Sequence, residues 1–332
     1  MTAQRILLVS PGFHGYWAAI SRALESKGHE VTVHCYDQPG PFVERLGNKI
    51  LHEMPERLRP QRAEDHMTRR AVAALKEVRP SVVVVVKGDQ LGADWWQMLD
   101  EERLPRVTWL YDELRRMRYT PEQVQSIGPI ASYSSQDTKE LARLGVNVQH
   151  LPLAYDSTVS VPRMAEEHVS FIGARYGSRE RLLRRLAASG VPVRAYGRTW
   201  SRHPYDVLRT HQFSNPGIPA GRDLARSRAY GVMKASPATL NIHGDQDGFT
   251  MRTFEAAGVG ALQILDRRDV DAFYEIGSEV LVFDSDDELV DLCKRAMRDP
   301  KWSEAIRSGG WRRTQAEHTF VHRIAALEAQ WG

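Results

Sequence analysis

The chain has 332 residues, which is enough for two domains that each bury a core of their own. Its formal net charge is only +3, from 45 lysines and arginines against 42 aspartates and glutamates. This mild basic excess suits small anionic ligands such as nucleotide diphosphates. It falls short of the clustered positive charge that is typical of a nucleic-acid-binding protein.

The two cysteines, Cys35 and Cys293, argue against a disulfide framework and cannot form a zinc site by themselves. The sequence has no run of about 18 apolar residues, so no membrane span is expected. A strand-like segment begins after the first four residues, which leaves no room for a secretory signal. We therefore expect a cytoplasmic protein.

Strand-like and helical segments alternate through the first half of the chain. The clearest buried strand is the β-branched run Ser81–Lys87, and Ser134 or Ser135 is placed to cap a helix over 136–144. The expected strands cover residues 5–10, 31–36, 81–87, 107–111, 130–133 and 148–151. This alternation predicts a doubly wound α/β domain with a parallel sheet.

The same alternation restarts after a polar segment, 154–165, that we expect to be an interdomain linker. Ser178 is placed to cap a helix that ends at Ala188, whereas 201–222 is rich in Pro and Gly and predicts little order. The expected strands cover residues 168–172, 191–196, 238–242, 261–265 and 279–283. A second α/β domain is therefore predicted, followed by a final segment at 320–330.

The most informative stretch is 238–265, which reads as a strand, a polar loop, a helix that ends at Gly258, and a second strand. In open α/β sheets, ligands bind beyond the carboxyl ends of the strands, and the next helix points free N–H groups at them. Asp247 and Glu255 can accept hydrogen bonds from sugar hydroxyls, while Arg252 adds a cation three residues before Glu255. The loop also supplies Gly248 and the amides of Phe249 and Thr250.

This acidic pair, followed by Ala-Ala-Gly, resembles the acidic motif of GT-B glycosyltransferases, with Asp247 where glutamate is commoner. The sequence is also similar to the CgeB-like branch of the group 1 glycosyltransferases in the segments LNIH, RTFEAAGVGALQILD and EVLVF, and in HTFVHR near the end. The resemblance implies two Rossmann-like parallel-sheet domains: an acceptor-binding domain at 1–155 and a nucleotide-sugar-binding domain at 166–316. It also implies that 317–332 forms a helix that packs back on the N-terminal domain.

The resemblance extends to further residues of the site. We expect Gly173 and Arg175 to contact the diphosphate, because a guanidinium after the first strand of the second domain can neutralise a leaving phosphate. Gly197 and His243 end other strands of that domain and are expected beside the same ligand.

The N-terminal loop Gly12, Phe13 and Gly15 is expected on the acceptor side. Many inverting GT-B enzymes use a histidine after the first strand as general base, oriented by an aspartate. His14 and Asp112 are the candidates for this catalytic pair.

Two alternatives concern the chemistry. Asp245-Gln246-Asp247 is a D-x-D pattern, which holds a divalent metal in GT-A glycosyltransferases, but the two-sheet organisation favours the metal-free reaction. We expect no metal and no cofactor, with a nucleotide-diphosphate sugar as donor substrate.

A nucleotide-sugar 2-epimerase and a non-catalytic sugar- or nucleotide-binding protein share the fold and stay open as alternative functions. The acceptor is also open, a nucleic acid included, as is the oligomeric state.

Overall fold

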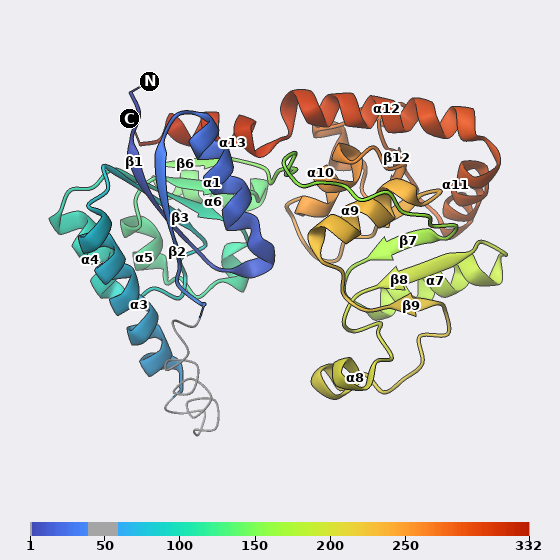
Figure 1. Cartoon of the computed structure of the whole chain (residues 1–332), viewed down its shortest axis with the longest axis horizontal. Helices are drawn as coiled ribbons and strands as arrows, with labels where there is room; N and C mark the ends of the chain where they lie inside the picture. The colour runs from blue at the N-terminus through green and yellow to red at the C-terminus, as the bar shows by residue number, and fades with distance from the viewer. Residues whose placement is uncertain (1, 39–58, 332) are drawn as a thin grey trace. The chain divides into compact units, whose positions relative to one another are not determined.

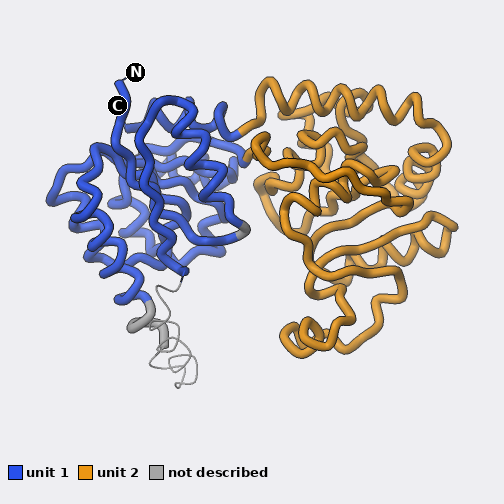
Figure 2. The backbone as a smooth tube through the Cα atoms, in the orientation of Figure 1, with its two compact units in different colours: residues 1–153, 320–332 blue, residues 154–319 orange. Residues whose placement is uncertain are grey.

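The computed structural model describes residues 2–38 and 59–331, which form two compact units (Figures 1 and 2). Unit 1 comprises residues 1–153 and 320–332, and unit 2 comprises residues 154–319. Each unit holds one parallel sheet with helices packed on it. The α/β class that strand–helix alternation predicts is therefore confirmed.

The described part of unit 1 contains a six-stranded parallel sheet whose four central strands are largely buried, whereas the two edge strands are partly exposed. All five residues of β3 are valines of at most 3% exposure, as expected of a strand covered on both faces. In spatial order the strands are β2 (Glu30–Cys35), β1 (Arg5–Ser10), β3 (Val82–Val86), β4 (Arg106–Leu110), β5 (Ile130–Ser132) and β6 (Val148–His150).

Alternate residues of these strands face two different helical layers. Leu7 and Val9 pack in one core cluster with Leu75 of α3 and with Trp95 and Leu99 of α4. The helical elements of unit 1 are η1 (Phe13–Gly15), α1 (Tyr16–Ser26), α3 (Arg59–Val78), α4 (Ala93–Glu101), η2 (Leu114–Arg116), α5 (Pro121–Ser126), α6 (Ser135–Arg143) and α13 (Phe320–Glu328).

The last helix, α13, returns to unit 1 and packs beside α1 (Figure 1). The ring of Phe320 lies 6.2 Å from that of Trp109 on β4, and Arg323 donates to the carbonyl of Pro152 at 2.8 Å. Buried His29 lies 2.8 Å from the carboxylate of Glu328. The predicted return of the C-terminal helix to the N-terminal domain is confirmed.

Unit 2, in which every residue from 154 to 319 is described, contains the second six-stranded parallel sheet. Its core cluster joins Phe171 and Leu240 on the strands to Leu183 of α7, Cys293 of α11 and Ile306 of α12. In spatial order the strands are β12 (Leu281–Val282), β11 (Gln263–Leu265), β10 (Thr239–Asn241), β7 (Val169–Ile172), β8 (Val193–Tyr196) and β9 (Ala220–Gly221).

The helices of unit 2 include one that the sequence pattern does not predict. The segment 201–222, expected to lack order, contains α8 and β9, and α8 begins with a proline at its first turn. The helical elements are α7 (Gly177–Ala188), α8 (Pro204–Thr210), α9 (Arg226–Ala235), α10 (Met251–Gly258), η3 (Arg268–Ala272), α11 (Asp286–Arg298) and α12 (Pro300–Glu317).

Other local predictions have mixed outcomes. Ser134 caps α6 as expected, since its hydroxyl accepts from the amide of Asp137 at 3.0 Å. The prediction that Ser178 caps α7 is wrong, because the helix already begins at Gly177 and its N-cap is Tyr176. No helix in the described ranges is long and apolar enough to cross a bilayer.

The order of strands places one switch point in each sheet, where the chain changes the direction in which it adds strands. In unit 1, β1 has β2 on one side and β3 on the other. In unit 2, β7 has β8 on one side and β10 on the other. Loops at the carboxyl ends of these central strands are where an open α/β sheet binds ligands.

Candidate functional site

The loops after β7 and β10 lie at the switch point of unit 2. The first begins at Gly173, and the second holds residues 243–250. Because β7 and β10 are parallel neighbours, their carboxyl ends open at the same edge of the sheet. The structure thus brings together the two loops that supply most of the residues predicted to bind a nucleotide sugar.

Arg179, on the first turn of α7, holds these two loops together. Its Nε and Nη2 donate to the carbonyl oxygen of Ile242 at 2.9 and 2.6 Å, and its Nη1 donates to that of Ala174 at 3.1 Å. The guanidinium carbon lies 5.4 Å from the ring centre of Phe171 and 4.8 Å from that of Tyr176. Burial lowers the pKa of Arg179. One cation therefore fixes the spacing of both loops.

His243, the first residue of the second loop, is held by Asp266 at the end of β11. Its Nδ1 lies 2.8 Å from Oδ1 of Asp266, and its backbone N–H donates to both carboxylate oxygens at 3.0 Å. The imidazole is 1% exposed and packs edge-on against Phe249, with ring centres 5.1 Å apart. In the neutral imidazole with Nδ1 donating to the carboxylate, Nε2 is the acceptor nitrogen. Nε2 is buried and has no hydrogen-bond partner among the described residues.

The rest of the loop is held by Arg267. Its Nη1 donates to the carbonyl of Gln246 at 2.8 Å and its Nη2 to that of Asp247 at 2.7 Å. Its guanidinium carbon also lies 4.2 Å from the centre of the Phe249 ring. Gly248 is buried within the loop, so the backbone packs closely there. The loop therefore has a defined shape before any ligand arrives.

Glu255 lies on the helix that follows, and its carboxylate is buried. Thr250 is the N-cap residue of α10, which places the first amides of the helix beside the loop. Glu255 is 1% exposed, accepts from the hydroxyl of Tyr230 at 3.1 Å, and lies 3.4 Å from Nη1 of Arg252. A sugar hydroxyl would have to reach this carboxylate by displacing one of these partners.

Arg175 and two predicted glycines, Gly173 and Gly197, lie in the loops that follow the neighbouring strands β7 and β8. The Arg175 side chain is 6% exposed and donates to both carboxylate oxygens of Glu180, at 2.8 and 3.0 Å. Two further hydrogen bonds reach Ser214, so this guanidinium is fully engaged within unit 2. Gly197 has a φ of +152°, and a Cβ there would meet the carbonyl oxygen of Gly173 at 2.5 Å. Only glycine allows this close approach of the two loops.

The predicted acceptor-side residues follow β1 in unit 1. The amide of Gly12 donates to Asp37 at 2.6 Å, and Phe13 is 60% exposed. Gly15 has a φ of +68° and is the N-cap residue of α1. The backbone of His14 lies in η1, but its side chain lies outside what the structure describes.

Asp112 follows β4, and its carboxylate lies 3.6 Å from the ammonium of Lys87. Because β3 lies between β1 and β4, Asp112 and His14 follow strands that are two spacings, or roughly 10 Å, apart. Lys87 follows β3 and is the residue that the structure places beside Asp112. The pairing of His14 with Asp112 stays a prediction.

Two buried polar groups near the switch point of unit 1 lie outside the predicted set. Asp89 is 8% exposed, and its Oδ2 accepts from the amide of Arg118 at 3.2 Å. Its Oδ1 and the hydroxyl of Tyr36 are buried without a hydrogen-bond partner in the part of the chain that is described. Buried polar groups without a hydrogen-bond partner are uncommon in folded proteins.

The structural roles of Asp266, Arg267 and Tyr230 are also missed by sequence reasoning. Each acts through a partner more than 19 positions away, so no local spacing marks it. Asp245, the first carboxylate of the D-x-D pattern, is exposed. Within residues 2–38 and 59–331, no group of three or more His, Cys, Asp or Glu side chains is arranged to hold a metal ion.

Comparisons with known proteins bear on this site. Residues 178–329 match the model of a family described as glycosyl transferase-like. A search of curated proteins found no match. The structure resembles sucrose-phosphate synthase from Thermosynechococcus elongatus at 13% identity, with a TM-score of 0.64 and coverage of 98% of both chains.

Two further structures bind or act on nucleotide sugars. The Anabaena protein HepE in complex with UDP-glucose is 12% identical, with a TM-score of 0.64 over 98% of this chain and 100% of that chain. A UDP-N-acetylglucosamine 2-epimerase is 14% identical, with a TM-score of 0.52 over 92% and 91%. At these identities the likeness shows the fold, which is GT-B. The sequence match to the family described as glycosyl transferase-like covers residues 178–329, a little under half of the chain, and lies in the C-terminal part of this GT-B-like fold.

Proposed function

We propose that the protein transfers a sugar from a nucleotide-diphosphate sugar to an acceptor hydroxyl. The observation that carries this proposal is the pair of loops at the switch point of unit 2, fixed by Arg179, Asp266 and Arg267 before any ligand binds. Preorganised polar groups at such a place are what a phosphate and sugar ligand requires. The UDP-glucose in the HepE structure suggests a uridine nucleotide and a hexose as the first ligands to try.

The residues have distinct proposed roles. The first amides of α10, next to Phe249 and Thr250, face the diphosphate, and Nε2 of His243 accepts from a sugar hydroxyl. Glu255 accepts from the ribose once Tyr230 or Arg252 releases its oxygens. These contacts together hold the nucleotide sugar in unit 2.

Arg175 is proposed to act on the diphosphate, and its geometry constrains how. Its guanidinium already donates to Glu180 and Ser214, and its backbone N–H donates to Thr199 at 2.8 Å. The positive charge therefore lies at a fixed place after β7, close to Gly173. From there it stabilises a phosphate through its field, or directly after releasing one partner.

Transfer forms a bond between the acceptor oxygen and C1 of the sugar and breaks the bond from C1 to the phosphate oxygen. The nucleotide diphosphate leaves with the bonding electrons, and its added charge is met by the helix amides and Arg175 without a metal. If configuration inverts, His14 takes the acceptor proton and Asp112 supports it. If configuration is retained, the departing phosphate takes the proton. Asp89 and Tyr36 are proposed to orient the acceptor.

The test is to incubate the purified protein with UDP-glucose and a panel of acceptors and to follow UDP release and new glycosides by NMR. UDP release that depends on an acceptor, with a glycoside formed in equal amount, supports transfer. In a second incubation with UDP-N-acetylglucosamine and no acceptor, conversion of this nucleotide sugar to an isomer would assign the protein to the epimerase alternative. Nucleotide binding with no product from any acceptor would indicate a binding protein.

A further inference from the structure

Helix α8 of unit 2 buries its acidic residue and exposes its apolar ones. A helix at the surface of a protein normally does the reverse, because its apolar side chains pack on the core. In α8 (Pro204–Thr210), Asp206 is 3% exposed, whereas Tyr205 and Leu208 are 58% and 70% exposed. Residues three positions apart lie on the same face of a helix. Tyr205 and Leu208 therefore present one apolar face to solvent.

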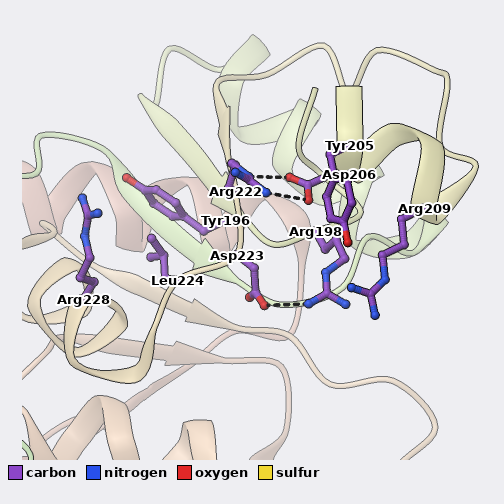
Figure 3. Close-up of a pocket in the computed structure, with 9 residues that line it drawn as sticks. All are labelled: Tyr196, Arg198, Tyr205, Asp206, Arg209, Arg222, Asp223, Leu224 and Arg228. Atoms are coloured by element: carbon purple, nitrogen blue, oxygen red, sulfur yellow. Dashed lines mark hydrogen bonds and ion pairs between the residues drawn. The ribbon is translucent and has the colours of Figure 1, made fainter. Parts of the chain in front are cut away.

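Polar contacts hold α8 in place. Both carboxylate oxygens of Asp206 accept from Arg222, at 2.8 and 3.1 Å, as Figure 3 shows. The hydroxyl of Ser201 donates to the same carboxylate at 2.7 Å. No extensive packing joins α8 to another helix or strand of unit 2, all of whose residues are described. The apolar face of α8 is thus available to another surface while the helix itself is fixed.

The apolar surface continues past the end of the helix. Phe213 is 77% exposed, more than any other large hydrophobic side chain in the described ranges. Its ring lies 6.5 Å from that of His211, the C-cap residue of α8. In Figure 1, α8 and the segments that lead to it extend beyond β9, away from the helices that cover the sheet. We call Tyr205, Leu208 and Phe213 the α8 patch.

Positive charge accompanies the α8 patch. The segment 201–222 holds three arginines, Arg202, Arg209 and Arg222, and its one acidic residue is Asp206. Arg222 is paired with Asp206, whereas Arg202 and Arg209 are exposed. Exposed apolar side chains among cations, with no exposed acid to balance them, are typical of a surface that lies in the headgroup layer of an anionic membrane.

The same charges favour a lipid surface over a second copy of the chain. A symmetric dimer through the α8 patch would bring Arg202 and Arg209 of one copy toward those of the other, and like charges across an interface are unfavourable. Nucleic acid would account for the arginines, but Leu208 offers the bases no aromatic ring on which to stack. An anionic bilayer accounts for both features, because its phosphates attract the arginines and its interior takes up the apolar side chains.

We propose that the α8 patch binds the surface of a membrane that contains anionic phospholipids. Leu208 and Phe213 enter the boundary between headgroups and acyl chains, while Arg202 and Arg209 lie at the lipid phosphates. The contact is peripheral, since the patch lies on the bilayer and does not span it. This proposal goes beyond sugar transfer and does not depend on it.

The experiment is co-sedimentation of the full chain with phosphatidylcholine vesicles that either contain or lack phosphatidylglycerol. Binding is expected to the vesicles that contain phosphatidylglycerol and should weaken as salt is added. Leu208→Ser/Phe213→Ser should lower this affinity about tenfold or more, because two apolar side chains no longer enter the bilayer. Arg202→Ala/Arg209→Ala should lower it by about fivefold for each arginine.

Leu144→Ser is the matched control. Leu144 is 67% exposed but lies in unit 1, so this variant should bind vesicles as the wild type does. Thermal unfolding of all variants should match that of the wild type, because every changed side chain is exposed.

Four results would overturn the proposal. The first two are absence of binding to phosphatidylglycerol vesicles and equal binding of the wild type and Leu208→Ser/Phe213→Ser. The third is equal binding to vesicles with and without phosphatidylglycerol, which would remove the arginines from the contact. The fourth is a different partner for the same patch: a dimer in sedimentation velocity, or binding of a DNA oligonucleotide, that Leu208→Ser/Phe213→Ser abolishes. Absence of sugar transfer would count against the proposed function and leave the membrane contact standing.

Discussion

Replacement of Arg179 by alanine should loosen both loops of the nucleotide-sugar site at once. The change leaves two backbone carbonyls, those of Ile242 and Ala174, without the guanidinium that bonds them. A hydrogen bond to a charged group contributes about 1.5–3 kcal/mol, so two acceptors give about 3–6 kcal/mol. Water compensates for part of the lost hydrogen bonding because the side chain is only partly buried. The expected net loss of local stability is therefore about 2–4 kcal/mol.

Hydrogen exchange followed by mass spectrometry measures this loss where it occurs. The amides of Gly173 and His243 are hydrogen-bonded in the wild type, to Tyr196 and Asp266, and should exchange about 30- to 1,000-fold faster in Arg179→Ala. UDP-glucose affinity should fall with them, because the loops would no longer be preorganised.

Two variants of the same helix sharpen this prediction. Arg179→Lys keeps one positive charge but can bond only one carbonyl well, so it should exchange at an intermediate rate. Arg181→Ala removes an exposed arginine of α7 and should behave as the wild type. Unchanged exchange and unchanged ligand affinity in Arg179→Ala would show that the two loops are held by other contacts.

Three other predictions address the backbone, the general base and the metal. Gly197→Ala should destabilise unit 2 by about 1–3 kcal/mol from backbone strain alone, and its Cβ would also displace Gly173. Gly177→Ala is the control and should leave the stability unchanged, because the space around Gly177 is open. Thermal unfolding of the two variants and the wild type measures the difference. If the product is inverted, His14→Ala and Asp112→Asn should each lower turnover by about 10²- to 10⁴-fold with nucleotide-sugar affinity preserved, and an inverted product formed at the wild-type rate would remove His14 from the mechanism. Activity should survive EDTA, and loss restored by Mn²⁺ would instead assign a metal to the D-x-D carboxylates.

The sheets and their order of elements were predictable because the pattern that predicts them is local. The valine run Val82–Val86 and the run Arg5–Ser10 are buried strands in the structure, with ends shifted by at most a residue or two. The short strand β9 and the helix α8 escaped prediction. The two-residue strand β9 is too short to show a periodic pattern. Pro and Gly residues in the segment 201–222 favour its interpretation as a loop.

The site was predictable as a place, but its side-chain partners were not. The strand–loop–helix pattern of the sequence predicts the loop 243–250, and the order of strands in the sheet places this loop at the switch point. The side-chain partners depend on which segments pack against α7 and α10. Arg175 is bonded to Glu180 and Ser214, and Glu255 is buried beside Tyr230, for this reason. One sequence carries no record of such contacts between distant segments.

The most direct test of the central claim is calorimetric titration of UDP-glucose into the wild-type protein and into Glu255→Gln. The account predicts saturable binding to the wild type and an affinity at least tenfold lower in the variant, with both proteins unfolding at similar temperatures. The loss follows because the neutral amide accepts more weakly than the carboxylate and has an NH₂ donor in place of one of its two acceptor oxygens. Equal affinities would contradict the assignment of Glu255, and no binding of UDP-glucose or any other nucleotide-diphosphate sugar would contradict the proposed site altogether.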